Sequence, residues 1–284
     1  MRPEGWQDTE RLIRMALAED QADADATSGL LSDDVTGRAV IVAREAGVLA
    51  GIDVALAVFR RVDDSLDASP VLPDGARFER GQHLGVVEGS LTSILRAERP
   101  ALNFLQRLCG IATSVRAYAD AIAGTGAAFI DTRKTLPGWR LLDKYAVRMG
   151  GGRNHRMSLA DGVLIKDNHI AAAAREGRPL AYLVERARAW APHTVRVEVE
   201  CDTLEQVREA VEAGADVVML DNMSLDLMRE GVALCKGKAL TEASGGVTLE
   251  TVRAVAETGV DFVSSGAVTH SVRALDVSLD VELG

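Results

Sequence analysis

The chain has 284 residues, of which 47% are hydrophobic and 26% are charged, and this balance excludes an intrinsically disordered protein. Its formal net charge of −10 argues against binding to nucleic acid or to an anionic membrane, because phosphate groups would be repelled. Any anionic ligand would therefore need a local cluster of cations. The three cysteines are odd in number and widely spaced, which favours core packing in a reducing compartment over a disulfide framework or a zinc site.

The N-terminal part of the chain predicts one helix, a loop and two strands. Its first ten residues lack the apolar stretch of a secretory signal, and no apolar run can cross a bilayer, so we expect a cytoplasmic protein. Apolar residues at helical spacing predict a helix over 9–19 with Thr9 as its N-terminal cap. The polar stretch 20–32 is expected to be a loop. Two β-prone stretches punctuated by glycine, 38–49 and 77–87, predict strands with turns.

A long helical pattern covers 91–123, in which Pro100 marks a first turn or a break. After Gly124, short apolar runs alternate with helical segments. The runs are 128–131, 162–166, 195–200, 217–221, 240–244 and 261–265, and the helices are 140–149, 180–190, 204–213, 225–235 and 249–258. Continuously apolar strands that alternate with helices predict a parallel sheet buried on both faces. We expect a βα barrel, with an open doubly wound sheet as the alternative.

Polar residues follow nearly every one of these predicted strands. They are Asp131, Thr132, Arg133 and Lys134; Lys166, Asp167, Asn168 and His169; Glu200; Asp221 and Asn222; Ser244, Gly245 and Gly246; and Ser265, Gly266 and Ala267. In barrels and in open α/β sheets alike, the carboxyl ends of the strands form the active-site face. Charged side chains are costly there unless they are paired, solvated or liganded. The pattern therefore predicts an active site and not a purely structural polar rim.

The segment 131–166 is cationic, with eight basic residues against three acidic ones. The basic residues are Arg133, Lys134, Arg140, Lys144, Arg148, Arg153, Arg156 and Lys166. Lys144 and Arg148 lie at helical spacing and are expected to form a solvated face. The others indicate a substrate with several negative charges, because the planar fork of arginine suits carboxylate and phosphate groups. His155 precedes Arg156 directly, and a ligand contact and a structural role both remain open for it.

Two further features indicate a phosphorylated sugar. The loops 244–246 and 265–267 each follow a late strand, where barrels often bind phosphate through backbone N–H groups. Glu200 and Asp221 end neighbouring predicted strands, and carboxylates in a phosphate site hold Mg²⁺ or bind sugar hydroxyls. An ion pair with cations of the rim is the alternative for these two acids.

Seven motifs follow one another along the second half of the chain: DTRKTLPG (131–138), KYAVRMGGGRNHR (144–156), LIKDNHI (164–170), EVE (198–200), MLDNM (219–223), EASGGVT (242–248) and GAVTHS (266–271). Through these motifs the chain resembles the quinolinate phosphoribosyltransferase family. The resemblance implies an N-terminal α/β sandwich domain over 1–113, to which 274–284 returns, and an incomplete, seven-stranded α/β barrel of the type II phosphoribosyltransferases over 114–273. It also implies the transfer of a phosphoribosyl group to quinolinate with loss of carbon dioxide, with Mg²⁺ as cofactor, in a homodimer.

The resemblance further implies a role for each matched residue. Arg99 would reach into the partner's active site, and Lys134 would lie between the two substrates. The residues around the quinolinate carboxylates would be Arg133, His155, Arg156 and Lys166. Glu200 and Asp221 would hold the ribose hydroxyls and Mg²⁺, and 244–246 and 265–267 would take the 5′-phosphate. Thr132 and His270 complete the substrate-binding set, and the catalytic set is Lys134, Lys166, Glu200 and Asp221.

The chain departs from the family pattern at Ser265, where an apolar residue is usual, and at Trp139, where leucine is usual. A related family associated with molybdenum transport shares the fold but lacks the segment KDNH, which this chain has at 166–169. Two other readings remain: a barrel aldolase or synthase in which Lys166 forms a Schiff base, and a non-catalytic protein that binds a phosphorylated ligand.

Overall fold

The computed structural model describes residues 3–27, 30–32 and 34–282, which fall into two compact units. The N-terminal unit contains Met1–Arg116, Thr135–Gly151 and Ala267–Gly284, and the barrel unit contains Ala117–Lys134 and Gly152–Gly266. Compactness alone does not define where a domain ends, so the domain bounds given by the resemblance stay predictions. Parts of the predicted loop 20–32 and of the return 274–284 lie outside the described residues.

The N-terminal unit is built on a four-stranded antiparallel sheet in the order β12-β1-β5-β3. Its strands are β1 (Thr36–Ala43), β3 (Asp67–Pro70), β5 (His83–Ser90) and β12 (Val277–Glu282). The last described segment of the chain thus pairs with the first strand, with Ala39 opposite both Val87 and Val281. Each of the two predicted stretches is divided into two strands by a turn. The first contains β2 (Gly47–Val48) after β1, the second contains β4 (Arg77–Phe78) before β5, and β2 pairs with β4.

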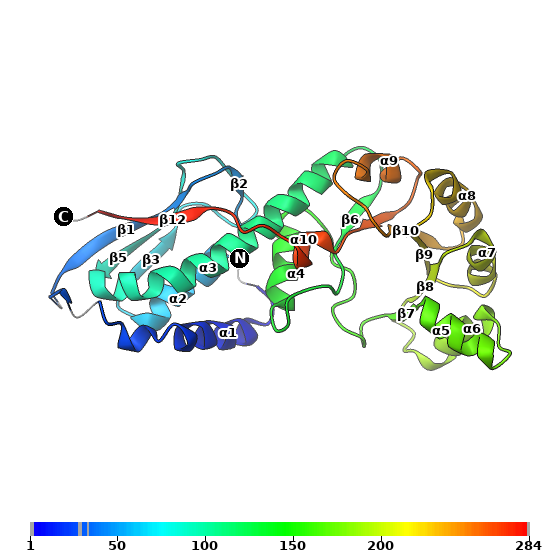
Figure 1. Ribbon diagram of the computed structural model, residues 1–284, viewed down its shortest axis with the longest axis horizontal. Coiled ribbons are helices and arrows are strands. Elements are labelled where there is room, and N and C mark those ends of the chain that lie inside the picture. The colour runs from blue at the N-terminus through cyan, green and yellow to red at the C-terminus, as the bar shows by residue number, and fades with distance from the viewer. Residues whose placement is uncertain (1–2, 28–29, 33, 283–284) are drawn as a thin grey trace. The chain divides into compact units, whose positions relative to one another are not determined.

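The helices of this unit are α1 (Trp6–Glu19), η1 (Ala22–Ala24), α2 (Ile52–Val62), α4 (Arg140–Met149), α10 (Ala267–His270) and the larger part of α3 (Leu91–Ala121), up to Arg116 (Figure 1). The prediction of Thr9 as a cap was wrong, since α1 begins earlier, its N-cap is Gly5, and Thr9 is buried inside the helix. Pro100 does not break α3. Proline removes one helical hydrogen bond, and the buried neighbours Ala101 and Leu102 offset that loss by packing.

Helix α2 was not predicted, and its start depends on a residue far along the chain. The carboxylate of Asp74 accepts hydrogen bonds from the backbone N–H groups of Gly51 and Ile52 at 2.9 and 3.1 Å, which satisfies two donors that a helix start leaves unpaired. The hydroxyl of Tyr145 on α4 donates to the same carboxylate at 2.6 Å. Burial raises the pKa of Tyr145 far above its ordinary value, and the negative charge of Asp74 raises it further.

Helix α4 is buried on several sides, and this overturns part of the prediction for its cations. Lys144 is 1% exposed and does not belong to a solvated face, whereas Arg148 is exposed and pairs with Glu4 at 2.9 Å. Within the helix, Asp143 is fully buried and accepts a forked hydrogen bond from Arg107 of α3, at 3.2 Å from Nε and 2.9 Å from Nη2. This ion pair ties α3 to α4.

The barrel unit contains a six-stranded sheet in the order β6-β11-β10-β9-β8-β7, with every neighbouring pair parallel. The strands are β6 (Ala128–Ile130), β7 (Val163–Ile165), β8 (Val197–Cys201), β9 (Val217–Asp221), β10 (Leu240–Ser244) and β11 (Phe262–Ser264). From β7 to β11 the order follows the chain without a reversal, so the predicted barrel is confirmed and the doubly wound sheet is excluded. An isolated parallel bridge from Ile130 to Arg153 extends the sheet beyond β6.

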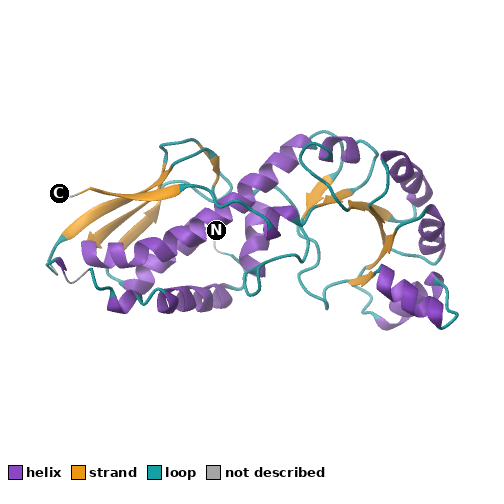
Figure 2. Ribbon diagram, in the orientation of Figure 1, coloured by secondary structure: helices purple, strands orange, loops and turns teal. Residues whose placement is uncertain are grey.

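Helices cover the outer side of this curved sheet (Figure 2). They are α5 (Asp167–Arg175), α6 (Leu180–Trp190), α7 (Leu204–Glu212), α8 (Leu225–Cys235) and α9 (Val252–Ala256). Three of them match the prediction closely, α9 is shorter than predicted, and α5 was not predicted. Because the helices occupy the outside, the strands direct alternate side chains into the barrel.

The three cysteines are free and buried, as their composition predicted. Burial raises the pKa of Cys109 and of Cys201 to about 12 and that of Cys235 to about 11, so all three thiols stay protonated and unreactive. None of the helices among the described residues is both long and apolar enough to cross a membrane.

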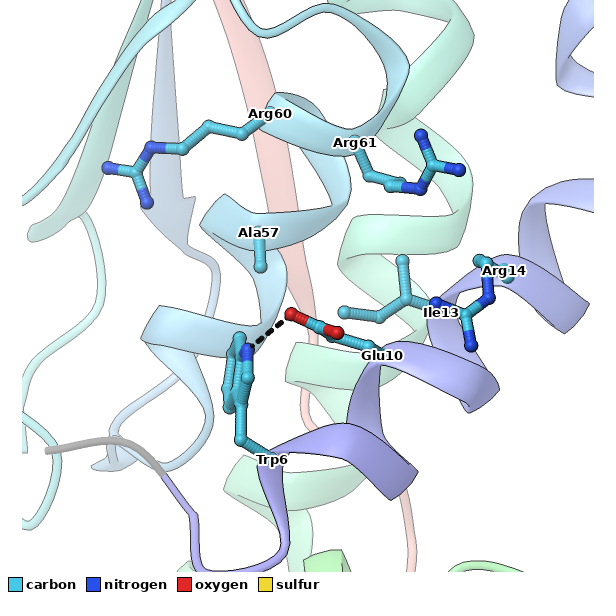
Figure 3. A pocket seen from close by; sticks show the side chains of 7 residues that line it. All are labelled: Trp6, Glu10, Ile13, Arg14, Ala57, Arg60 and Arg61. Carbon is cyan, nitrogen blue, oxygen red and sulfur yellow. Dashed lines mark hydrogen bonds between the residues drawn. The ribbon is translucent and has the colours of Figure 1, made fainter.

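A cavity of about 400 Å³ opens between α1 and α2 of the N-terminal unit (Figure 3). It is lined by Trp6, Glu10, Ile13, Arg14, Ala57, Arg60 and Arg61. The indole of Trp6 donates a hydrogen bond to Glu10 at 2.9 Å, so the one acid in this lining is already engaged. None of the residues predicted for the active site lines this cavity.

Candidate active site

The register of the parallel strands places the predicted rim residues side by side. Asp221 lies opposite Ser244, and Glu200 lies one strand further along, opposite Met219. On the other side of β10, Ser264 lies opposite Ile130, which directly precedes Asp131. The carboxyl ends of these strands therefore form one edge, as the prediction of an active-site face requires.

Lys166 and Glu200 form an ion pair at this edge, with Nζ 2.8 Å from Oε2. Lys166 caps the start of α5, and its backbone N–H donates to Nδ1 of His169 at 2.9 Å. Its side chain is 47% exposed and that of Glu200 is 14% exposed, so the ammonium group can leave the pair when an anionic ligand competes for it. The alternative of an ion pair with a rim cation is therefore realised for Glu200 in this structure.

Asp221 lies close enough to Glu200 for the two carboxylates to repel each other. Burial raises the pKa of Asp221, and the negative charge of Glu200 raises it further, while a hydrogen bond from Asn222 at 2.6 Å lowers it. Two repelling carboxylates on neighbouring strands are stabilised by a cation between them. Oxygen donors of this kind suit Mg²⁺, so the residues present fit the ion implied by the resemblance.

The cations on the opposite part of the edge repel each other as well. Burial lowers the pKa of Arg156, and the positive charge of Arg133 lowers it further. Arg156 is fixed through Nη1, which donates to the carbonyl of Gly162 at 2.7 Å, and Nε of Arg133 is buried without a partner among the described residues. Two neighbouring guanidinium groups with unused donors form a site for an anion with several oxygens. The hydroxyl of Thr132 accepts from the N–H of Lys134 at 3.1 Å and shapes the turn between them.

Behind this rim lies a cluster of acids that the sequence analysis did not assign to the site. Nε2 of His155 is 3.0 Å from Glu198 and 3.6 Å from Glu242, and both acids lie on strands two residues before a predicted rim residue. Asp131 is fully buried and accepts from the N–H of His155 at 2.8 Å. A signal was present, because an acid inside a predicted strand points to the same side of the sheet as the residue two places on, which here is a predicted rim residue. Among the described residues, His155, Glu198 and Glu242 are the group whose ligand atoms lie close enough together to hold a metal ion.

The two glycine loops are tied to each other and to the neighbouring strand. Gly245 has φ +91°, and a Cβ added there would lie 2.2 Å from Oδ1 of Asn222 and 2.9 Å from its backbone nitrogen, so only glycine fits. Gly246 has open space beside it, where a ligand can approach the backbone. The hydroxyl of Ser265 donates to the carbonyl of Val247 at 3.3 Å, which explains how a polar residue is accommodated at this buried position.

Three predicted site residues belong to the N-terminal unit. Ala267 and His270 lie in α10, and Arg99 lies in α3 with its side chain 58% exposed, 3.5 Å from Glu98. Their participation in the site stays a prediction. The other predicted residues all belong to the barrel unit, where the structure gathers them at the strand ends described above.

Two family models match consecutive parts of the chain. The C-terminal domain of quinolinate phosphoribosyl transferase matches residues 111–280, and the N-terminal domain matches residues 25–109. The chain belongs to the quinolinate phosphoribosyltransferase family. Together the two matches extend over most of the chain and include both the sandwich sheet and the barrel.

Individual relatives agree with this assignment. The chain is 41% identical to a probable nicotinate-nucleotide pyrophosphorylase [carboxylating] of Bacillus subtilis, over 96% of this chain and 93% of that protein. It is 42% identical to the chloroplastic nicotinate-nucleotide pyrophosphorylase [carboxylating] of rice, over 97% of this chain and 78% of that protein. Among solved structures, NadC from Streptococcus pyogenes matches with a TM-score of 0.94 and 38% identity, and 99% of each chain is covered.

Proposed function

We propose that this protein transfers the phosphoribosyl group of phosphoribosyl pyrophosphate to quinolinate, with loss of carbon dioxide, to give nicotinate mononucleotide and pyrophosphate. This is a pentosyltransferase step of de novo NAD biosynthesis, and membership of the family supports it. The supporting observation in the structure is the division of charge along one barrel edge. Two neighbouring guanidinium groups, of Arg133 and Arg156, suit a planar diacid, while the carboxylates of Glu200 and Asp221 suit sugar hydroxyls or a cation.

At the quinolinate end, Arg133, Arg156 and Lys166 bind the two carboxylates, with His155 beside them. The ion pair of Lys166 with Glu200 opens as the substrate carboxylate replaces Glu200 as the partner of the ammonium group. Lys134 lies between the substrates, and Thr132 orients it through the turn that their hydrogen bond stabilises.

At the phosphoribosyl end, Glu200 and Asp221 bind the ribose hydroxyls and hold Mg²⁺, which when bound neutralises charge on the leaving pyrophosphate. The 5′-phosphate is bound by Ser244, Gly245, Gly246, Ser265, Gly266 and Ala267, with His270 completing the substrate-binding set. Gly245 and Gly246 both have positive φ, a conformation that other residues rarely adopt and that allows the backbone N–H groups of a turn to bind an anion.

The reaction needs no protein nucleophile. The ring nitrogen of quinolinate forms a bond to the anomeric carbon as the bond to pyrophosphate breaks, and the positive charge that develops on the sugar is stabilised by Glu200 and Asp221. The ring nitrogen is then quaternary, so it stabilises the carbanion left when the adjacent carboxylate departs as carbon dioxide. That carbanion takes up a proton from water. Lys166 acts as a charge held by a carboxylate 2.8 Å away and not as a Schiff-base amine.

We further propose that the protein works in the cytoplasm as a homodimer in which Arg99 of each chain reaches the partner's active site. The side chain of Arg99 is 58% exposed, and its ion pair among the described residues is with the adjacent Glu98 at 3.5 Å, which supports such a role. The three buried thiols are compatible with a reducing compartment.

The test is a direct assay of the purified protein with quinolinate, phosphoribosyl pyrophosphate and Mg²⁺. We expect carbon dioxide and pyrophosphate in equal amounts, and we expect chelation of the metal to stop both. Pyrophosphate without carbon dioxide would contradict the proposed decarboxylation. Covalent trapping of the substrate on Lys166 by borohydride would contradict the proposal and favour the aldolase reading. Ligand binding without any product would favour the non-catalytic reading.

A further inference from the structure

The cluster below the rim joins three elements of the barrel unit. His155 lies on the segment that follows Gly152, Glu198 lies on β8 and Glu242 lies on β10, on either side of β9. All three side chains are nearly closed off from solvent, with 13%, 9% and 3% exposed in that order. Buried carboxyl groups are costly, so their presence inside a barrel that could be filled with apolar side chains calls for an explanation.

The hydrogen bonds of His155 fix its tautomer. Its Nδ1 accepts from the backbone N–H of Arg156 at 2.7 Å, so Nδ1 carries no hydrogen. Nε2 must therefore carry the hydrogen, and it donates to Oε2 of Glu198 at 3.0 Å. The imidazole ring is thus held at both nitrogens, by Glu198 at Nε2 and by the backbone N–H of Arg156 at Nδ1.

This arrangement speaks against a metal ion on the same three groups. A histidine that binds a metal through Nε2 has its hydrogen on Nδ1 and donates it to an acceptor. Here Nδ1 faces an N–H donor, so Nε2 has no lone pair to offer. The carboxyl groups then act as hydrogen-bonding partners of the ring and not as ligands.

We propose that Glu198 and Glu242 are positioning residues for quinolinate, which act through His155 to hold Arg156 in place. The proposal rests on the function proposed above, because Arg156 is there a ligand of a quinolinate carboxylate. The segment is fixed at further points, since Asp131 accepts from the N–H of His155 and from the side chain of Asn154, both at 2.8 Å. The guanidinium group of Arg156 donates to the carbonyl of Gly162 at 2.7 Å and lies close to Arg133.

The two acids have different parts in this arrangement. Burial raises the pKa of Glu242 well above its ordinary value, and the negative charge of Glu198 raises it further, which favours the protonated form of Glu242. Oε2 of Glu198 accepts the hydrogen of Nε2 of His155 at 3.0 Å, so Glu198 holds the ring directly. Oε2 of Glu242 lies 3.6 Å from the same nitrogen.

The kinetic test compares substitutions of the same chemistry at the two acids. Glu198→Gln replaces the carboxylate that accepts from Nε2 of His155 with an amide, and we expect the KM for quinolinate to rise about tenfold or more, with the KM for phosphoribosyl pyrophosphate changed less than about twofold. Glu242→Gln keeps a polar side chain of the same size near the ring, so its effect on the quinolinate KM should be clearly smaller, whereas Glu242→Leu removes both polar atoms and should approach Glu198→Gln. The exposed Glu212→Gln on α7 is the matched control and should leave the kinetics unchanged.

The second measurement does not depend on activity and uses the wild-type protein. Nitrogen-detected magnetic resonance of labelled histidine, assigned by its loss in His155→Asn, should show a neutral ring with the hydrogen on Nε2. The inference is overturned by a hydrogen on Nδ1, by a stoichiometric metal ion that Glu242→Leu removes, or by an unchanged quinolinate KM in an active Glu198→Gln. A wild-type protein that shows the expected tautomer but no turnover would instead refute the proposed function alone.

Discussion

The two units of the molecule treat their buried charges in opposite ways. In the N-terminal unit, Arg107 and Asp143 neutralise each other through a forked contact, and Asp143 is completely closed off from solvent. In the barrel unit, like charges adjoin: Arg133 near Arg156, and Glu200 near Asp221. A matched pair holds two helices together, whereas adjoining like charges are typical of functional sites, where a ligand can supply the opposite charge in addition to Lys166. The contrast therefore separates a structural ion pair, Arg107–Asp143, from the proposed binding site.

The strongest test of this contrast is a substrate with one carboxylate in place of two, which leaves part of the cationic site without a partner. Nicotinate lacks the 2-carboxylate of quinolinate, so part of the donor set of Arg133 and Arg156 would stay desolvated without a partner. We expect kcat/KM for nicotinate to be lower than for quinolinate by a factor of about 10⁴. Competition assays with both compounds measure this ratio. Efficient turnover of nicotinate would show that the two guanidinium groups do not face the substrate.

The next largest effect concerns the stability that the Arg107–Asp143 ion pair provides. Asp143→Ala leaves Arg107 without its carboxylate partner in a largely buried position, and we expect a loss of about 3 kcal/mol in the free energy of unfolding. Chemical denaturation measures the loss. The double variant Arg107→Met, Asp143→Leu removes both charges and should recover much of the stability. If the single and double variants are equally unstable, the pair does not behave as a matched unit.

A smaller effect is expected at the fork of Arg133. Arg133→Lys keeps the positive charge but cannot donate two parallel hydrogen bonds, so the KM for quinolinate should rise about tenfold. Its melting temperature should stay close to that of the wild type, because Nε of Arg133 has no partner among the described residues. Steady-state kinetics beside thermal unfolding separates the two quantities. Kinetics close to those of the wild type would remove Arg133 from the substrate site.

The sequence predicted the barrel well because each strand is a short apolar run that ends in a polar residue. That pattern predicts Glu200, Asp221 and Ser244 on one edge, and the register confirms that these residues lie on neighbouring strands. Local patterns were less reliable in the N-terminal unit. Helix α2 begins at glycine with its cap supplied by Asp74, and Pro100 is carried within α3 by packing, so tertiary contacts overrode local preferences in both cases.

The residues that sequence reasoning missed are those whose role depends on a distant partner. Lys144 lies at a spacing typical of a solvated helix face, and only the packing of α4 shows that it is buried. Glu198 and Glu242 are separated by more than forty positions in the chain, and the imidazole that they share comes from a third segment. No local pattern reveals that three such groups meet.

The hydroxyl of Ser265 has a consequence for the proposed binding of a phosphorylated sugar at the barrel edge. By donating to the carbonyl of Val247, it joins the loop after β11 to the loop after β10, and Gly245 in turn leaves no gap against Asn222 after β9. Three successive turns thus form one mechanical unit, and none can shift without disturbing its neighbour. We expect natural substitutions in these three turns to occur together. A larger side chain at position 245 alone would displace Asn222, and with it the turn after β9.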